Sequence, residues 1–106
     1  MKWLTGLWRR IRNWLTPPYR AVEVADLPET LAPHTLYLVG EGEPWQAAMM
    51  CPCGCRATVQ LSMVPRDRPS WSAVVMGGKV SLCPSVWRVR GCGSHFFLTA
   101  NRIHWC

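Results

Sequence analysis

Three cysteines lie within the five residues Cys51-Pro52-Cys53-Gly54-Cys55, and this run most constrains how the 106-residue chain can fold. A second thiol-containing segment, Gly91-Cys92-Gly93-Ser94-His95, follows later in the chain. A chain this short buries only ~60–70% of the surface that its unfolded form exposes, so its small core gains stability from an added cross-link such as a bound metal. Zinc takes about four thiolate or imidazole ligands in tetrahedral geometry. The sequence therefore predicts one zinc site that joins two distant loops.

The two loops divide the predicted ligands between them. Cys92 and His95 form a pair of the spacing that zinc sites use, and two of the three clustered cysteines supply the other half. Glycines in both loops suit tight turns in which backbone amides approach sulfur. The sequence leaves open which four of five candidates bind the zinc, and Cys106 is a further, less favoured candidate. The candidate ligands are Cys51, Cys53, Cys55, Cys92 and His95.

The scarcity of acidic residues near the predicted zinc site favours a structural metal over a catalytic one. A hydrolytic zinc keeps an open coordination position and needs a nearby base, yet residues 48–106 contain one carboxylate, Asp67. A structural zinc contributes roughly 10–16 kcal/mol, comparable to the ~5–15 kcal/mol stability of a whole domain. We therefore expect a non-catalytic, zinc-stabilised interaction or accessory module. The alternative is a hydrolase or peptidase that uses zinc or a Cys–His pair such as Cys92 and His95.

The fold is expected to be mainly β, a small antiparallel β domain with zinc-bound loops. Residues 58–64 alternate between apolar and polar side chains, as a half-buried strand does. Gly77-Gly78 separates two β-rich runs and predicts a two-residue hairpin turn. Together with the final hairpin, the predicted strands are 21–24, 36–39, 58–64, 72–76, 79–82, 95–99 and 102–106.

The final hairpin is expected to turn at Ala100-Asn101. This two-residue turn places Thr99 opposite Arg102 and Phe96 opposite Trp105. One face of the hairpin is then apolar and belongs to the core. The other face carries His95, which this register brings within side-chain reach of Cys106.

The N-terminal segment differs from the rest of the chain. Residues 2–15 carry apolar side chains at spacings of three and four with basic residues between them, which predicts an amphipathic helix ended by Thr16-Pro17-Pro18. The expected division is a basic amphipathic helix over 1–18 and a zinc-binding β domain over 19–106. Packing on the chain's own sheet is favoured for the helix, followed by a protein partner, and peripheral membrane contact is disfavoured. The run before Arg9 is too short for a secretory signal, so the expected location is the cytoplasm.

A third class of function, nucleic-acid binding, is suggested by charge. The formal net charge is +6, and residues 48–106 contain seven basic residues. Trp71 and Trp87 are aromatic side chains of the kind that stack on bases. No known nucleic-acid-reading motif accompanies them, so this interpretation ranks below the other two.

Residues 49–106 resemble a family of small bacterial proteins that carries a domain-of-unknown-function label. The resemblance rests on the ordered motifs CPCGC at 51–55, SLCPSVW at 81–87, GCGSHF at 91–96 and RIHWC at 102–106. It implies a compact zinc-binding β domain that uses the cysteines and histidine named above. The association of the family's genes with bacterial ubiquitin-like conjugation or defence cassettes implies protein partners from such a pathway. The resemblance implies no particular activity.

Overall fold

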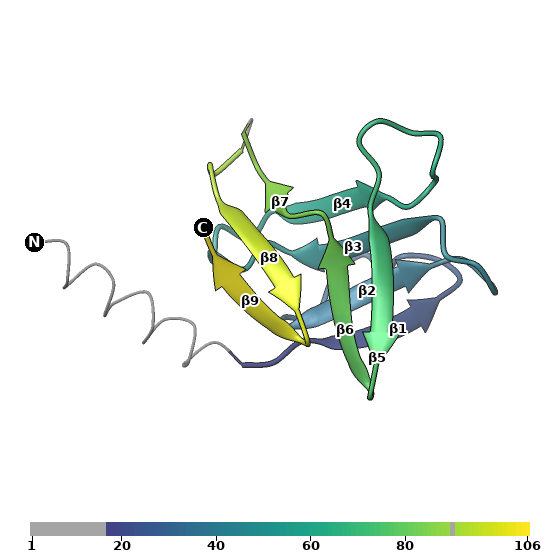
Figure 1. The fold of residues 1–106 in the computed structure, drawn as a ribbon. Helices are drawn as coiled ribbons and strands as arrows, with labels where there is room; N and C mark the ends of the chain where they lie inside the picture. Colours follow the sequence, from purple (N-terminus) through teal and green to yellow (C-terminus); the bar gives the residue numbers. More distant parts are fainter. Residues whose placement is uncertain (1–16, 90) are drawn as a thin grey trace, which may run out of the picture.

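A computed structural model describes residues 17–89 and 91–106 of the chain (Figure 1). The predicted helix over residues 2–15 lies outside these residues, and the proposed division after residue 18 is not tested. Nine strands and no helix occur in the described part, so the mainly β prediction is confirmed. The strands are β1 Arg20–Val24, β2 Thr35–Val39, β3 Gln46–Met50, β4 Thr58–Ser62, β5 Ser72–Met76, β6 Lys79–Cys83, β7 Val86–Trp87, β8 His95–Thr99 and β9 Arg102–Trp105.

The strands form three sheets, ordered β1-β2-β3-β4, β5-β6 and β7-β8-β9. In Figure 1 the β5–β6 and β8–β9 hairpins lie across the four-stranded sheet and form a second layer. The prediction of an antiparallel domain needs one correction, because β1 pairs with β2 in parallel. Residues 25–34 make this possible, because they lead the chain back to the end of the sheet at which β1 begins, and β2 then runs in the same direction as β1.

Both predicted hairpin turns are present. Gly77 and Gly78 have positive φ angles, and so do Ala100 (49°) and Asn101 (69°), as a turn between closely paired strands requires. The predicted register of the last hairpin is confirmed from Thr99 opposite Arg102 to Phe96 opposite Trp105. The Asn101 side chain also accepts a 2.7 Å hydrogen bond from the Val80 amide, which ties this turn to β6.

The sequence did not indicate β3, the strand between β2 and β4. Its central residues Ala47, Ala48 and Met49 are completely buried. Both faces of this strand are covered, so its sequence lacks the alternation of a half-buried strand. Alanine is also depleted in strands in general, which hides the strand further.

One apolar core fills the space between the two layers. It contains fully buried side chains from all three sheets, among them Leu36, Leu82 and Phe96. A smaller cluster of Leu31, Tyr37 and Ala48 covers the opposite face of the four-stranded sheet. Among the described residues, no helix has the length and hydrophobicity needed to span a membrane.

Candidate active site and metal centre

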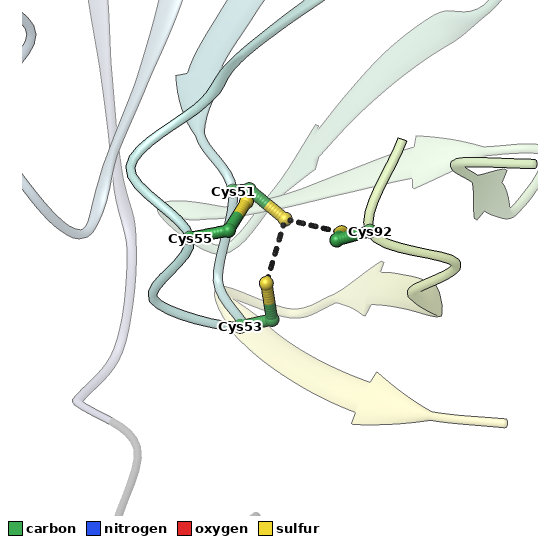
Figure 2. A group of neighbouring side chains, drawn as sticks. All are labelled: Cys51, Cys53, Cys55 and Cys92. Carbon is green, nitrogen blue, oxygen red and sulfur yellow. Dashed lines mark hydrogen bonds between the residues drawn. The ribbon is translucent and has the colours of Figure 1, made fainter. Parts of the chain in front are cut away.

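Four cysteine side chains converge between two loops (Figure 2). Cys51, Cys53 and Cys55 come from the β3–β4 connection, Cys92 comes from the β7–β8 connection, and the four sulfur atoms all lie within 4.8 Å of one another. The Cys51 Sγ lies 3.4 Å from the Cys53 Sγ and 3.6 Å from the Cys92 Sγ. Zn–S bonds of ~2.3 Å in a tetrahedron place sulfur atoms ~3.8 Å apart, so the four thiols fit a zinc ion.

Local backbone geometry creates this arrangement. After Cys51 the chain turns back sharply, with the Gly54 amide donating to the Cys51 carbonyl. Gly54 (φ 92°) and Gly93 (φ 78°) both occupy the left-handed region, which glycine enters without the steric cost that other residues meet. In the second loop the amides of Gly91 and Gly93 both donate to the Arg88 carbonyl and bend the chain around Cys92.

The electrostatic environment of the thiols differs from one cysteine to the next. Burial raises the pKa of Cys51 to about 12, because the charged thiolate loses its hydration. Hydrogen bonding from Ser94, whose Oγ lies 3.1 Å from the Cys92 Sγ, lowers the pKa of Cys92 to about 6. Burial opposes ionisation of Cys53, but hydrogen bonds from Ser94 and the Cys55 backbone outweigh it and lower its pKa. The site thus favours thiolates at its exposed side.

Arg88 adds a positive charge beside the cluster. Its Nη1 atom lies 3.6 Å from the Cys55 Sγ and 3.7 Å from the Cys92 Sγ. A guanidinium that donates to thiolates offsets part of the negative charge that four such ligands bring together. Arg88 therefore connects the end of β7 to the proposed metal ligands.

His95, the fifth predicted ligand, faces a different group. Its Nε2 atom lies 3.0 Å from the Oγ of Ser85, the residue just before β7. It lies outside the four-cysteine group of the described chain. A hydroxyl within hydrogen-bond distance of an imidazole is the basic arrangement of a serine nucleophile and its general base.

Aromatic side chains hold the His95 ring. Trp87 lies opposite His95 in the β7–β8 pair, and the two rings stack with centroids 5.3 Å apart and planes 19° apart. Phe97, two residues further along β8, stacks on the histidine with a centroid distance of 6.4 Å. Trp87 and Phe97 are 62% and 45% exposed, so their role is not core packing. Among residues 17–89 and 91–106, no carboxylate forms an ion pair with His95, and these rings orient the imidazole instead.

Trp71 fixes the backbone next to the serine. Its indole Nε1 donates a 3.3 Å hydrogen bond to the Ser85 carbonyl. The sequence around Ser85 does not mark it as a nucleophile, because it lacks the glycine-flanked signature of some nucleophilic serines. Only the register of β7 with β8 brings Ser85 to His95. The motif SLCPSVW, which contains Ser85, was the one available signal.

A scan against protein-family models matches residues 23–106 to the family described as bacterial ubiquitination-like system serine protease (BubE). Comparison with curated proteins and with solved structures gave no match. The interpretation as a non-catalytic accessory module is therefore wrong, because the matched family is one of proteases. The hydrolase alternative is better supported, although it assigned the chemistry to zinc or a Cys–His pair. Since the match covers most of the sequence, the chain belongs to the BubE family of bacterial ubiquitination-like systems.

Proposed function

We propose that this protein is a serine protease in which Ser85 is the nucleophile and His95 is the general base. The observation that carries the proposal is the 3.0 Å distance between the Ser85 Oγ and the His95 Nε2. The family description supports the same type of chemistry. Membership in a ubiquitination-like system implies protein partners from that pathway, and the proposed substrate is an amide bond made by its ubiquitin-like protein.

The reaction follows from the geometry of the pair. His95 removes the proton from the Ser85 hydroxyl as its oxygen attacks the carbonyl carbon of the substrate amide. A new C–O bond forms, the C–N bond breaks, and His95 passes the proton to the departing amine. Water then attacks the acyl-enzyme with the help of His95, which breaks the C–O bond and releases a carboxylic acid and the free Ser85 hydroxyl.

The metal has a separate and structural role in this proposal. Four thiolates complete a tetrahedral zinc site and leave no position for water or substrate, whereas a catalytic zinc keeps one open. Cys51, Cys53, Cys55 and Cys92 would hold the ion. When bound, it supplies cross-linking of the two loops and no chemistry in the reaction.

The position of the cysteines shows what this cross-link would hold. Cys51 follows β3 directly, and Cys92 lies between β7, which follows Ser85, and β8, which begins with His95. An ion bound at the cluster therefore fixes the loop that separates the nucleophile from its base. A misplacement of about 1 Å at a reacting group costs on the order of a hundredfold in rate. The metal site thus supports catalysis by keeping Ser85 and His95 in register.

Labelling with a small alkyl fluorophosphonate tests the proposed nucleophile. The zinc-loaded chain should become phosphonylated at Ser85, as located by mass spectrometry of peptides. Ser85→Ala should abolish labelling, and His95→Gln should slow it at least a hundredfold, because general-base catalysis contributes roughly 10²–10⁴ in rate. Ser72→Ala, which removes an exposed serine of β5, should label as the wild type does. Labelling at another serine, or at Ser85 without dependence on His95, would overturn the assignment.

A second assay addresses the substrate. A fusion of the system's ubiquitin-like protein to a C-terminal reporter should be cut by the wild type and not by Ser85→Ala. Cleavage that persists in Ser85→Ala but disappears with chelator would favour metal-dependent hydrolysis and contradict the proposal.

A further inference from the structure

A pocket of about 720 Å³ separates the two strands β4 and β7. Its volume falls within the roughly 300–1,000 Å³ of ordinary ligand sites. β4 contributes Thr58 and Gln60 to its lining, and β7 contributes Trp87. β4 ends the four-stranded sheet and β7 ends the three-stranded sheet, so within the described chain neither has a strand on its outer side.

The hydrogen bonds of β4 show which of its backbone groups face the pocket. The Cys51 amide donates to Ala57 and the Met63 amide donates to Trp45, so the odd-numbered residues of this segment bond to β3. In an antiparallel pair the bonding direction alternates along the strand. Thr58 and Gln60 therefore direct their amides and carbonyls away from β3, toward the open side.

The same reasoning applies to β7. The Arg88 amide donates to the Ser94 carbonyl on the side of β8, so the backbone groups of Trp87 point the other way. The Ser85 carbonyl also points away from β8, since it accepts the hydrogen bond from Trp71. Within the described chain, the outward-facing backbone groups of Gln60 and Trp87 thus have no neighbouring strand to pair with.

Trp71 joins the two walls at one end. Its backbone amide donates a 2.8 Å bond to Ser62, the last residue of β4, and its indole donates to Ser85, just before β7. Ser85 directly precedes Val86, which lines the pocket, so the proposed nucleophile lies beside this end of the groove. A chain that entered between β4 and β7 would lead directly to Ser85.

We infer that the groove between β4 and β7 binds an extended peptide segment of the protein substrate by strand addition, with the amides of Gln60 and Trp87 as pairing points. The inference rests on the proposed function and adds the form in which the substrate is presented. Strand addition obtains affinity from main-chain hydrogen bonds, so an extended, unfolded segment is required and a helix is excluded. The free edges and their continuity with Ser85 favour this occupant over a second copy of the chain.

The variant Gln60→Pro tests the inference, because it removes an outward-facing amide and leaves the bonds between β3 and β4 in place. Proline is tolerated at such positions on edge strands. Val75→Pro is the matched control: Val75 is 61% exposed, and in the β5–β6 hairpin its amide faces outward, away from the groove. Two rates are measured for each protein, cleavage of a library of short random peptides and fluorophosphonate labelling at Ser85.

The ratio of peptide cleavage to labelling should fall at least tenfold in Gln60→Pro and stay at the wild-type value in Val75→Pro. An unchanged ratio in Gln60→Pro, or a wild type that is labelled but cuts no peptide in the library, would contradict peptide binding in the groove. Absence of labelling in the wild type would overturn the assignment of Ser85 as nucleophile. Peptide binding in the groove is then tested by NMR, which does not depend on catalysis.

NMR spectra of ¹⁵N-labelled Ser85→Ala protein give that independent result. The peptide library should shift the amide signals of Gln60 and Trp87 and leave that of Val75 in place. Absence of these shifts overturns strand addition, whatever the variants show. Shifts that follow protein concentration instead of peptide concentration would identify a second copy as the occupant.

Discussion

Cys92 and His95 lie at opposite ends of one short turn but contact different groups. The Cys92 Sγ is 3.6 Å from the Cys51 Sγ in the thiol cluster, whereas the His95 Nε2 is 3.0 Å from the Ser85 Oγ. The change from loop to strand at residue 95 separates them, because β8 begins there and directs His95 toward Trp87. A single segment thus connects the proposed metal ligands to the proposed general base, and changes at one are expected to reach the other.

Metal removal should lower stability and Ser85 reactivity together. Cys92→Ala deletes the only member of the four-cysteine group that lies in the described part of the β7–β8 connection, so the proposed cross-link between the two loops is lost. Structural zinc is worth roughly 10–16 kcal/mol, enough to unfold a domain of this size. We expect about one zinc per chain in the wild type, less than a tenth of that in Cys92→Ala, and a collapse of the thermal transition. Metal analysis and circular dichroism measure both, with Cys83→Ser, an exposed thiol outside the cluster, as the control. A folded, metal-free Cys92→Ala protein that still labels at Ser85 would contradict the linkage.

Zinc affinity should fall as the pH falls. Burial holds the pKa of metal-free Cys51 at about 12, so zinc must displace its proton at neutral pH. Cys92, with a pKa of about 6, is already a thiolate there and begins to compete for protons only near and below that value. Above pH 7, the affinity should therefore drop at least tenfold for each unit by which the pH is lowered, and below pH 6 it should drop more steeply for each such unit. Competition with a chelator dye at several pH values measures the slope.

Ser94→Ala provides the matched comparison for this slope. Loss of the hydroxyl should raise the pKa of Cys92 toward its ordinary value, since Ser94 is the main cause of the lowered pKa. The steep region should then move to higher pH. An identical profile in Ser94→Ala, or an affinity that does not change with pH, would contradict the proposed thiolate set.

Removal of Arg88 should weaken metal retention without removing a ligand. Its guanidinium lies within hydrogen-bond distance of the sulfurs of Cys55 and Cys92, and loss of such an outer partner typically costs about 10–100-fold in metal affinity. Arg88→Met keeps much of the apolar stem and deletes the charge and the donors. Zinc competition assays should show the loss, while Arg66→Met, an exposed change in another loop, should leave affinity unchanged. Equal affinity in Arg88→Met and the wild type would show that the contact is incidental.

The sequence predicted those features that depend on residues close together in the chain. The hairpin that contains Phe96 and Trp105 was predicted in register because alternation and a two-residue turn fix pairing over short distances. The grouping of Cys92 with the CPCGC run was also predicted, since clustered thiols have few roles other than metal binding.

The proposed catalytic pair could not be predicted in the same way. Cys92-x-x-His95 has the spacing of a zinc ligand pair, which grouped the histidine with the thiols. Its contact with Ser85 depends on the pairing of β7 with β8, and β7 is only two residues long. A strand this short leaves no periodicity to detect. The predicted zinc site also led to the wrong conclusion about function, because a closed metal site says nothing about a nucleophile elsewhere in the domain.

Trp87 should be a positioning residue for His95. Its ring stacks on the imidazole at 5.3 Å, and an aromatic pair of this kind is worth ~0.5–1.5 kcal/mol, which corresponds to about a twofold to tenfold change in rate. Trp87→Ala should therefore slow fluorophosphonate labelling at Ser85 by about that factor, and Trp87→Phe should restore most of the rate because a flat ring remains. Stability should fall by no more than the ~0.5–1.5 kcal/mol of the lost pair, because the side chain is 62% exposed, and the domain should stay folded. Trp45→Ala removes a comparably exposed tryptophan far along the chain and should leave labelling unchanged. If Trp87→Phe labels as slowly as Trp87→Ala, or if both label at the wild-type rate, stacking does not hold the base in place.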